Sequence, residues 1–118
     1  MEYGDFRRFL SRCHLSIDLF SRNPERELAF VTRTSVALAC GLPAIHVPFT
    51  EVSELIRWFD AGWLVESTDL DGLTAALTEA TRDPAVLAQK RAGASAVAVE
   101  LDPPRATAPL DELLGALP

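Results

Sequence analysis

The chain has 118 residues, of which 48% are hydrophobic and 24% charged, and its net charge is −6. This length and composition predict one globular domain, and the excess of acidic residues argues against a nucleic-acid-binding surface. The longest apolar stretch, residues 36–47, is interrupted by Gly41 and Pro43 and is too short to span a bilayer.

Charge and cysteine content also bear on the compartment and on metals. The first eight residues carry charges where a secretion signal needs an apolar run. Cys13 and Cys40 make no disulfide framework. No Cys/His spacing indicates a metal site, and we interpret His14 and His46 as structural residues. We therefore expect a cytoplasmic protein with no transmembrane segment, no bound metal and no cofactor.

The first half of the chain alternates between helix and strand patterns. Asp5 is expected to cap a short helix. Residues 14–20 alternate between apolar and polar side chains, which indicates a strand that has a polar side or lacks a neighbour. A helix is predicted over 27–40 and is ended by Gly41, because glycine favours the left-handed conformation found after helices. A short buried strand at 44–47 follows.

The second half continues this alternation. A helix over 51–60 precedes a third short strand at 63–65. Asp69 is expected to cap the next helix. Asp83, followed by Pro84 at the first helical position, opens another helix that extends to about residue 100.

A proline-rich tail ends the chain. Pro103 and Pro104 break the preceding helix, and Pro109 is expected to start a last short helix. One face of that helix is apolar and must pack on this domain or on a partner. Its members are Leu110, Leu113, Leu114 and Leu117. We therefore divide the chain into a domain over residues 1–102 and a tail over 103–118.

Helices that alternate with short apolar strands are typical of a parallel sheet. The predicted fold class is α/β, with a partial Rossmann-like sheet of about three strands and helices on both faces. Three strands are few for an open α/β sheet, and a truncated sheet exposes an edge with which another chain can pair. A homodimer formed through this open edge is one arrangement that would cover it.

The stretch from Asn23 to Thr34 joins the first strand to the next helix. It places Glu25, Glu27 and the free N–H groups of a helix start at the carboxyl end of the sheet, where ligands of such folds bind. Helix N-termini favour phosphate, and carboxylates accept hydrogen bonds from sugar hydroxyls, so a sugar diphosphate would use both. The alternative is that the two glutamates only favour the helix N-terminus electrostatically.

Seven features follow one another between residues 15 and 94. They are the loop, the Glu-rich helix start, Ala39-Cys40-Gly41-Leu42-Pro43 with its short strand, a second Glu-rich helix, Gly62-Trp63-Leu64-Val65, the Asp-capped helix and Asp83-Pro84. Together they resemble the C-terminal half of two-domain, GT-B-type retaining glycosyltransferases, the group called family 4 or group 1. The resemblance implies a nucleotide-sugar-binding domain.

In that family the helix start contacts the donor sugar and its diphosphate. The matching segment, similar to the helix start of one bacterial subgroup, is Arg26-Glu27-Leu28-Ala29-Phe30 with Thr32-Arg33. The resemblance therefore implies donor binding by Glu27 and by the amides of Leu28, Ala29 and Phe30. Thr32 and Arg33 are secondary candidates, with Arg33 as a fork for phosphate or carboxylate. No catalytic residue can be assigned.

The chain departs from the family pattern in several places. The second acid of the family, which contacts the ribose, is replaced by Val36 when counted back from Gly41, and valine cannot accept a hydrogen bond. Counted the other way, the first acid falls at Leu28, one residue past Glu27. The loop at 48–51 lacks the usual glycine pair. The Arg/Lys pair that neutralises the diphosphate, the first part of the sheet and the acceptor-binding domain all precede the matched region, and we see no replacement for them in this chain.

Two main functions follow as hypotheses. In the first, the chain is the donor-binding part of a glycosyltransferase of the hexosyltransferase type, which transfers a sugar from a nucleotide-diphosphate sugar to an acceptor. It would be inactive without an acceptor-binding domain or partner chain. In the second, favoured by Val36, it is a non-catalytic interaction or regulatory module derived from such a half. A stand-alone flavodoxin-like ligand-binding domain is weaker, because no glycine loop cradles a phosphate.

Overall fold

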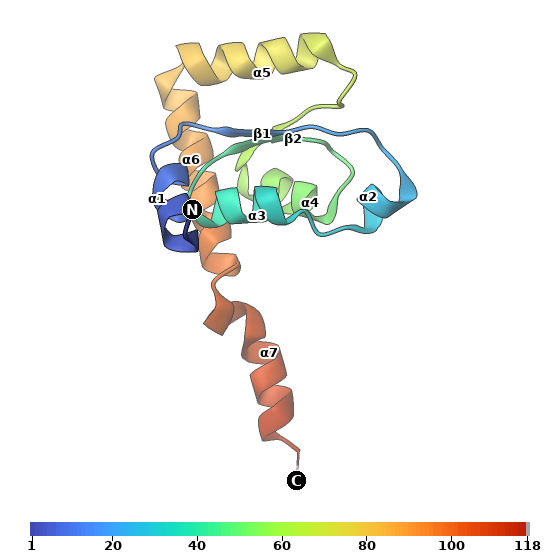
Figure 1. Cartoon of the computed structure of the whole chain (residues 1–118), viewed down its shortest axis with the longest axis vertical. Coiled ribbons are helices and arrows are strands. Elements are labelled where there is room, and N and C mark those ends of the chain that lie inside the picture. Colours follow the sequence, from blue (N-terminus) through green and yellow to red (C-terminus); the bar gives the residue numbers. More distant parts are fainter. Residues whose placement is uncertain (118) are drawn as a thin grey trace.

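The computed structural model describes residues 1–117 and has an α/β fold (Figure 1). In chain order the elements are α1 (Tyr3–Leu10), β1 (Ser16–Asp18), α2 (Pro24–Leu28), α3 (Thr32–Ala39), β2 (Ala44–His46), α4 (Glu51–Phe59), β3 (Gly62–Leu64), α5 (Leu70–Arg82), α6 (Pro84–Glu100) and α7 (Pro103–Gly115). No helix in residues 1–117 is long and apolar enough to cross a membrane.

The three strands form one parallel sheet in the order β1-β2-β3. Ile17 of β1 is opposite Ile45 of β2, which is in turn opposite Trp63 of β3. All three residues of β2 are buried, as expected for the central strand of a sheet that is covered on both faces. The predicted fold class, a three-stranded parallel sheet flanked by helices, is confirmed.

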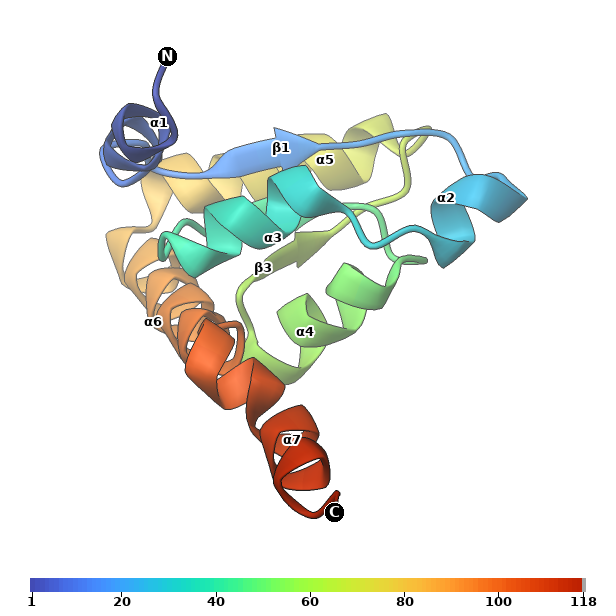
Figure 2. The ribbon, with the colours of Figure 1, turned by 60° about the horizontal axis from the view of Figure 1, so that its bottom comes forward.

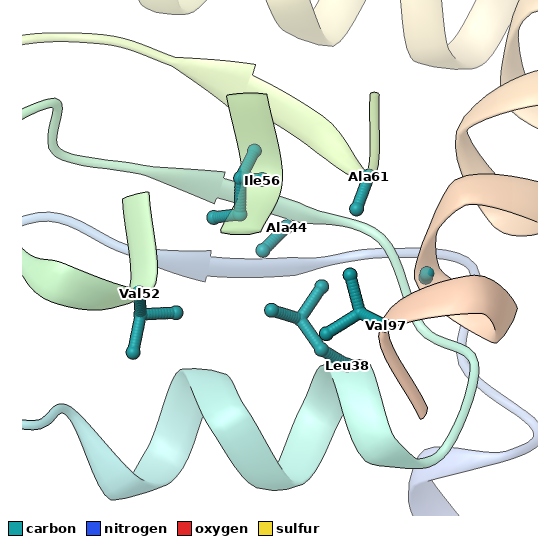
Figure 3. Close-up of a cluster of buried hydrophobic side chains, with 7 residues drawn as sticks. Leu38, Ala44, Val52, Ile56, Ala61 and Val97 are labelled. Atoms are coloured by element: carbon teal, nitrogen blue, oxygen red, sulfur yellow. The ribbon is translucent and has the colours of Figure 1, made fainter. Parts of the chain in front are cut away.

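Helices cover both faces of this sheet. In Figure 1, α5 lies above the sheet and α3 and α4 lie below it. The larger apolar core lies on the α3 and α4 side and also takes in α6. Figure 3 shows most of its members, which are Leu38, Ala44, Val52, Ile56, Ala61, Ala94 and Val97. The smaller core, under α5, is built on Ile45, Val65 and Ala76. Successive residues of β2 thus contribute to opposite cores, as the alternation of a strand requires.

Several helix ends follow the local sequence as predicted. Gly41 has a φ of +72°, and Leu42 N–H donates to the Ala37 carbonyl at 3.0 Å, which closes the end of α3. The side chain of Asp69 accepts a hydrogen bond from Gly72 N–H, and that of Asp83 accepts from the first turn of α6. These predictions are confirmed.

Three predicted boundaries are wrong. The helix expected over 27–40 is two helices, because the chain is extended at Ala29 and α3 starts anew at Thr32. Asp5 lies inside α1, whose N-cap residue is Glu2. Pro109 lies inside α7, which begins at Pro103. Proline is favoured at the first position of a helix, and an exposed helix can leave the carbonyl opposite a later proline to water.

The tail helix α7 projects away from the rest of the protein (Figures 1 and 2). None of its described residues is buried. The apolar face predicted for the tail is therefore not covered by this domain, since all four leucines are more than half exposed.

Gly62 of β3 lies close against the backbone of β2. A Cβ atom at this position would overlap the backbone of Ala44 in β2. We expect Gly62→Ala to lower the free energy of unfolding by about 2 kcal/mol or more, because strand backbone cannot move aside as a flexible side chain can. Gly4→Ala is the control: a Cβ atom there meets nothing, and stability should change by less than about 1 kcal/mol. Urea denaturation measures both, and equal effects would contradict the prediction.

Candidate functional site

The candidate site lies at the carboxyl ends of the three strands, where open α/β sheets bind ligands. β1 ends at Asp18 and β2 at His46. The chain that leaves β1 passes through α2 before it enters α3, and Figure 2 shows α2 beyond the arrowhead of β1. The loops after the strands and the first turns of α3 and α4 thus surround one end of the sheet.

A fully buried histidine connects these elements. His46 Nδ1 lies 3.1 Å from the backbone carbonyl of Asp18 and 3.2 Å from Thr34 Oγ1. The Thr34 hydroxyl donates to the Asp18 carboxylate at 3.0 Å, so its oxygen is free to accept from Nδ1. Both neighbours of Nδ1 are then acceptors, and we assign the proton to this nitrogen. His46 Nε2 accepts from the Thr50 hydroxyl at 2.8 Å.

This arrangement favours the neutral form of His46. Burial lowers the pKa of His46 below its ordinary value of 6.5, and the negative charge and backbone carbonyl of Asp18 oppose this shift only in part. Thr50 also caps α4, because its side-chain oxygen accepts from Ser53 N–H at 3.2 Å. One imidazole therefore joins the end of β1 and the first turns of α3 and α4.

Two aromatic rings and two arginines lie next to this histidine. The ring of Phe20 meets His46 and Phe49 edge-on, with centroid distances of 5.6 and 5.7 Å. The guanidinium of Arg22 lies 4.6 Å from the Phe49 ring centroid, and that of Arg26 lies 5.0 Å from the Phe20 centroid. The rings form a platform that carries two positive charges at the carboxyl end of the sheet.

Arg22 also links separate loops through ion pairs. Its Nη1 lies 2.9 Å from Glu27 Oε1, and its Nη2 lies 3.7 Å from Glu66 Oε1. Glu27 belongs to α2 and Glu66 follows β3. The glutamate expected to contact a sugar is thus paired with an arginine in this structure.

The other predicted site residues are divided between the two helices. Glu25 is exposed on α2, and Leu28 ends α2 with 86% of its surface exposed. Ala29 and Phe30 lie between the helices. The amides of residues 28–30 are therefore not at a helix start, whereas the sequence pattern had predicted that they would be. The reason is the extended backbone at Ala29, which ends α2.

The helix N-terminus at this site is that of α3. Thr32 and Arg33 are both exposed in its first turn, and the N-cap residue Val31 offers no side-chain hydrogen bond. Arg33 makes no salt bridge with any residue that the structure describes. Val36, the position of the missing acid, is half-buried and follows Thr32 and Arg33 by four and three residues. It therefore lies on the same face of α3 as these two residues.

Another cavity lies away from this site. It measures about 870 Å³ and runs along the outer edge of β3. Two pairs of its polar groups bind each other: Trp63 Nε1 donates to Glu79 at 2.6 Å, and Lys90 binds Asp60. We interpret it as a solvated groove. Among residues 1–117 no group of three His, Cys, Asp or Glu side chains could hold a metal ion.

Comparisons of the chain with protein-family models, with curated proteins and with solved structures give no significant match. The class of this protein is therefore described from its fold and from the geometry of its site. This is an α/β protein whose three-stranded parallel sheet carries a polar and aromatic cluster at its carboxyl ends.

The sequence patterns did not identify Asp18, Phe20, Arg22 or Thr50 as members of this cluster, nor the hydrogen bonds of His46. Only Thr50 had a local signal, since a threonine before Glu51 is a favoured helix cap. The contacts of His46 with Asp18 and Thr34 join residues that are 28 and 12 positions apart, and no periodicity reveals them.

The neutral state of His46 predicts a pH dependence of stability. The pKa is lower in the folded state, so the stabilisation is complete above 6.5 and is lost as the pH falls below that value. We expect the free energy of unfolding to fall by up to about 1.4 kcal/mol per pH unit as the pH falls below about 6.5.

The variant His46→Gln should lose this slope, whereas His14→Gln, which removes an exposed histidine, should keep it. Denaturant titrations at each pH measure the slope. The assignment to His46 is wrong if the two variants have the same slope.

Proposed function

We propose that the chain is the donor-binding part of a GT-B-type glycosyltransferase of the hexosyltransferase kind. The observation that carries this proposal is the presence of both required kinds of group at the carboxyl end of the sheet. The uncapped first turn of α3, with Thr32 and Arg33, suits a diphosphate. Glu25 and Glu27 of α2 suit the hydroxyls of a sugar.

In this role the N–H groups of α3 and the guanidinium of Arg33 stabilise the negative charge of the departing diphosphate. Glu27 orients the sugar by accepting hydrogen bonds from its hydroxyls. Val36 offers the ribose no acceptor, so this contact of the resembling family is absent. No side chain at the site is assigned as a nucleophile.

The proposal includes a partner. The acceptor must bind to a separate domain or chain that faces the carboxyl end of this sheet, and transfer requires both halves. We place the assembly in the cytoplasm, where cysteines such as Cys13 and Cys40, both free in the structure, stay reduced.

Calorimetric titration of the intact chain with UDP, GDP and their sugars tests this proposal. We expect one of these ligands to bind, and Glu27→Ala to lower the affinity for the nucleotide sugar relative to that for the free nucleotide about tenfold, because a hydrogen bond between the sugar and a charged group is lost. Glu112→Ala, an exposed acid on α7, is the matched control and should change nothing. The proposal fails if none of the nucleotides binds.

A second candidate is a non-catalytic interaction module that docks through its open sheet edge. No described residue pairs with the outer edge of β1. Ser16 N–H donates to Pro43 in the direction of β2, so the N–H and carbonyl of Ile17 point to the open side. Ile17 is 52% exposed. In this role two copies pair through β1 and form a homodimer.

Light scattering distinguishes this candidate. If β1 is the dimer interface, the wild-type chain should have twice the mass of one chain, and Ile17→Lys should be monomeric, because a lysine on an edge strand opposes pairing. Leu70→Lys replaces an equally large exposed residue on α5 and should remain dimeric. A monomeric wild-type protein excludes the homodimer.

A further inference from the structure

Arg22 is held in a way that suits an anion. Its guanidinium lies over the Phe49 ring at 4.6 Å, and its side chain is 55% exposed. Stacking on a ring fixes the plane of a guanidinium and leaves the N–H groups on its edge free to bind oxygen. Arg26 occupies the corresponding place on Phe20, and because the two rings touch, both cations share one platform.

The donors of Arg22 are at present turned toward carboxylates. Nη1 binds Glu27 at 2.9 Å and Nη2 lies 3.7 Å from Glu66. While this pair persists, Glu27 Oε1 is occupied and cannot serve a sugar hydroxyl fully. The ion pair between Arg22 and Glu27 therefore competes with the hydrogen bonds that Glu27 would accept from a sugar in the proposed function.

The pair is of a kind that a stronger anion can displace. Both partners are exposed, Arg22 by 55% and Glu27 by 39%, and exposed ion pairs contribute little to stability. A diphosphate carries more negative charge than a carboxylate and binds arginine through two parallel hydrogen bonds. Arg26 makes no salt bridge with any residue in 1–117, so its charge adds to this attraction.

We propose that Arg22 binds the diphosphate of the ligand and that Glu27 is its internal counter-ion. The bound diphosphate takes the place of Glu27 at Arg22, and the released carboxylate turns to the sugar. This rests on the proposed function and deepens it, because it couples recognition of the phosphate to recognition of the sugar. A free sugar meets a Glu27 carboxylate of which one oxygen is held by Arg22, whereas a sugar joined to a diphosphate releases both oxygens.

Titration of the intact chain with inorganic pyrophosphate tests the exchange. Arg22→Gln should weaken pyrophosphate binding about tenfold, because a charge-assisted bidentate contact is lost. Glu27→Gln should strengthen it about threefold or more, because the competitor for Arg22 is removed. The opposite signs of these effects are the signature of displacement.

Two matched variants control for general electrostatics. Arg7→Gln removes one positive charge from α1 and should leave binding within about twofold of the wild type. Glu25→Gln removes one negative charge from the same short helix as Glu27 but has no arginine partner among the described residues. It should strengthen binding less than Glu27→Gln does. Circular dichroism confirms that each variant is folded.

The exchange is overturned if pyrophosphate does not bind, if Arg22→Gln binds it as the wild type does, or if the Glu25 and Glu27 variants are indistinguishable. These outcomes are separate from a failure of the proposed function. Pyrophosphate binding with the expected signs, but no binding of any nucleotide, would retain the anion site and reject donor binding. Nucleotide binding that is insensitive to Arg22→Gln would retain donor binding and reject the exchange at Arg22.

Discussion

The hydrogen bonds of one buried imidazole hold the carboxyl end of this sheet together. His46 contacts the carbonyl at the end of β1, the hydroxyl in the first turn of α3 and the hydroxyl that caps α4. A buried polar network of this kind is stable only when every member has a partner, because an unpaired polar group in a low-dielectric interior is costly. The positions of three elements at the candidate site therefore depend on each other.

The surface of the site depends on the same residue. Phe20 packs edge-on against His46, Phe49 packs on Phe20, and these rings carry the guanidiniums of Arg26 and Arg22. The order runs from a buried histidine through two half-buried rings to the half-buried Arg26 and the exposed Arg22. An anion bound to the arginines would thus rest on groups whose positions are fixed by the core and not by mobile side chains alone.

The local signals in the sequence predicted the fold well and the site only in part. Gly41, Asp69 and Asp83 act on their immediate neighbours, so their effects could be predicted. The break between α2 and α3 could not, because the position of α3 is set by Thr34, whose partners Asp18 and His46 lie 16 and 12 residues away. Periodicity favoured one continuous helix that would have buried Leu28, and the long-range contacts leave that residue exposed.

The open edge of β1 and the open surface of the site have the same physical origin. A parallel sheet is ordinarily covered on both faces, and its edges are ordinarily protected. Here the outer edge of β1 is not paired with any other strand in residues 1–117. A further strand that runs parallel to β1 would end at the same level as Asp18, next to Arg33 and Thr34, and these three residues line a cavity of about 190 Å³. A chain that adds such a strand would therefore also add groups to the site. For this reason the proposed donor-binding role and the proposed interaction role share one edge, and a partner at β1 bears on both.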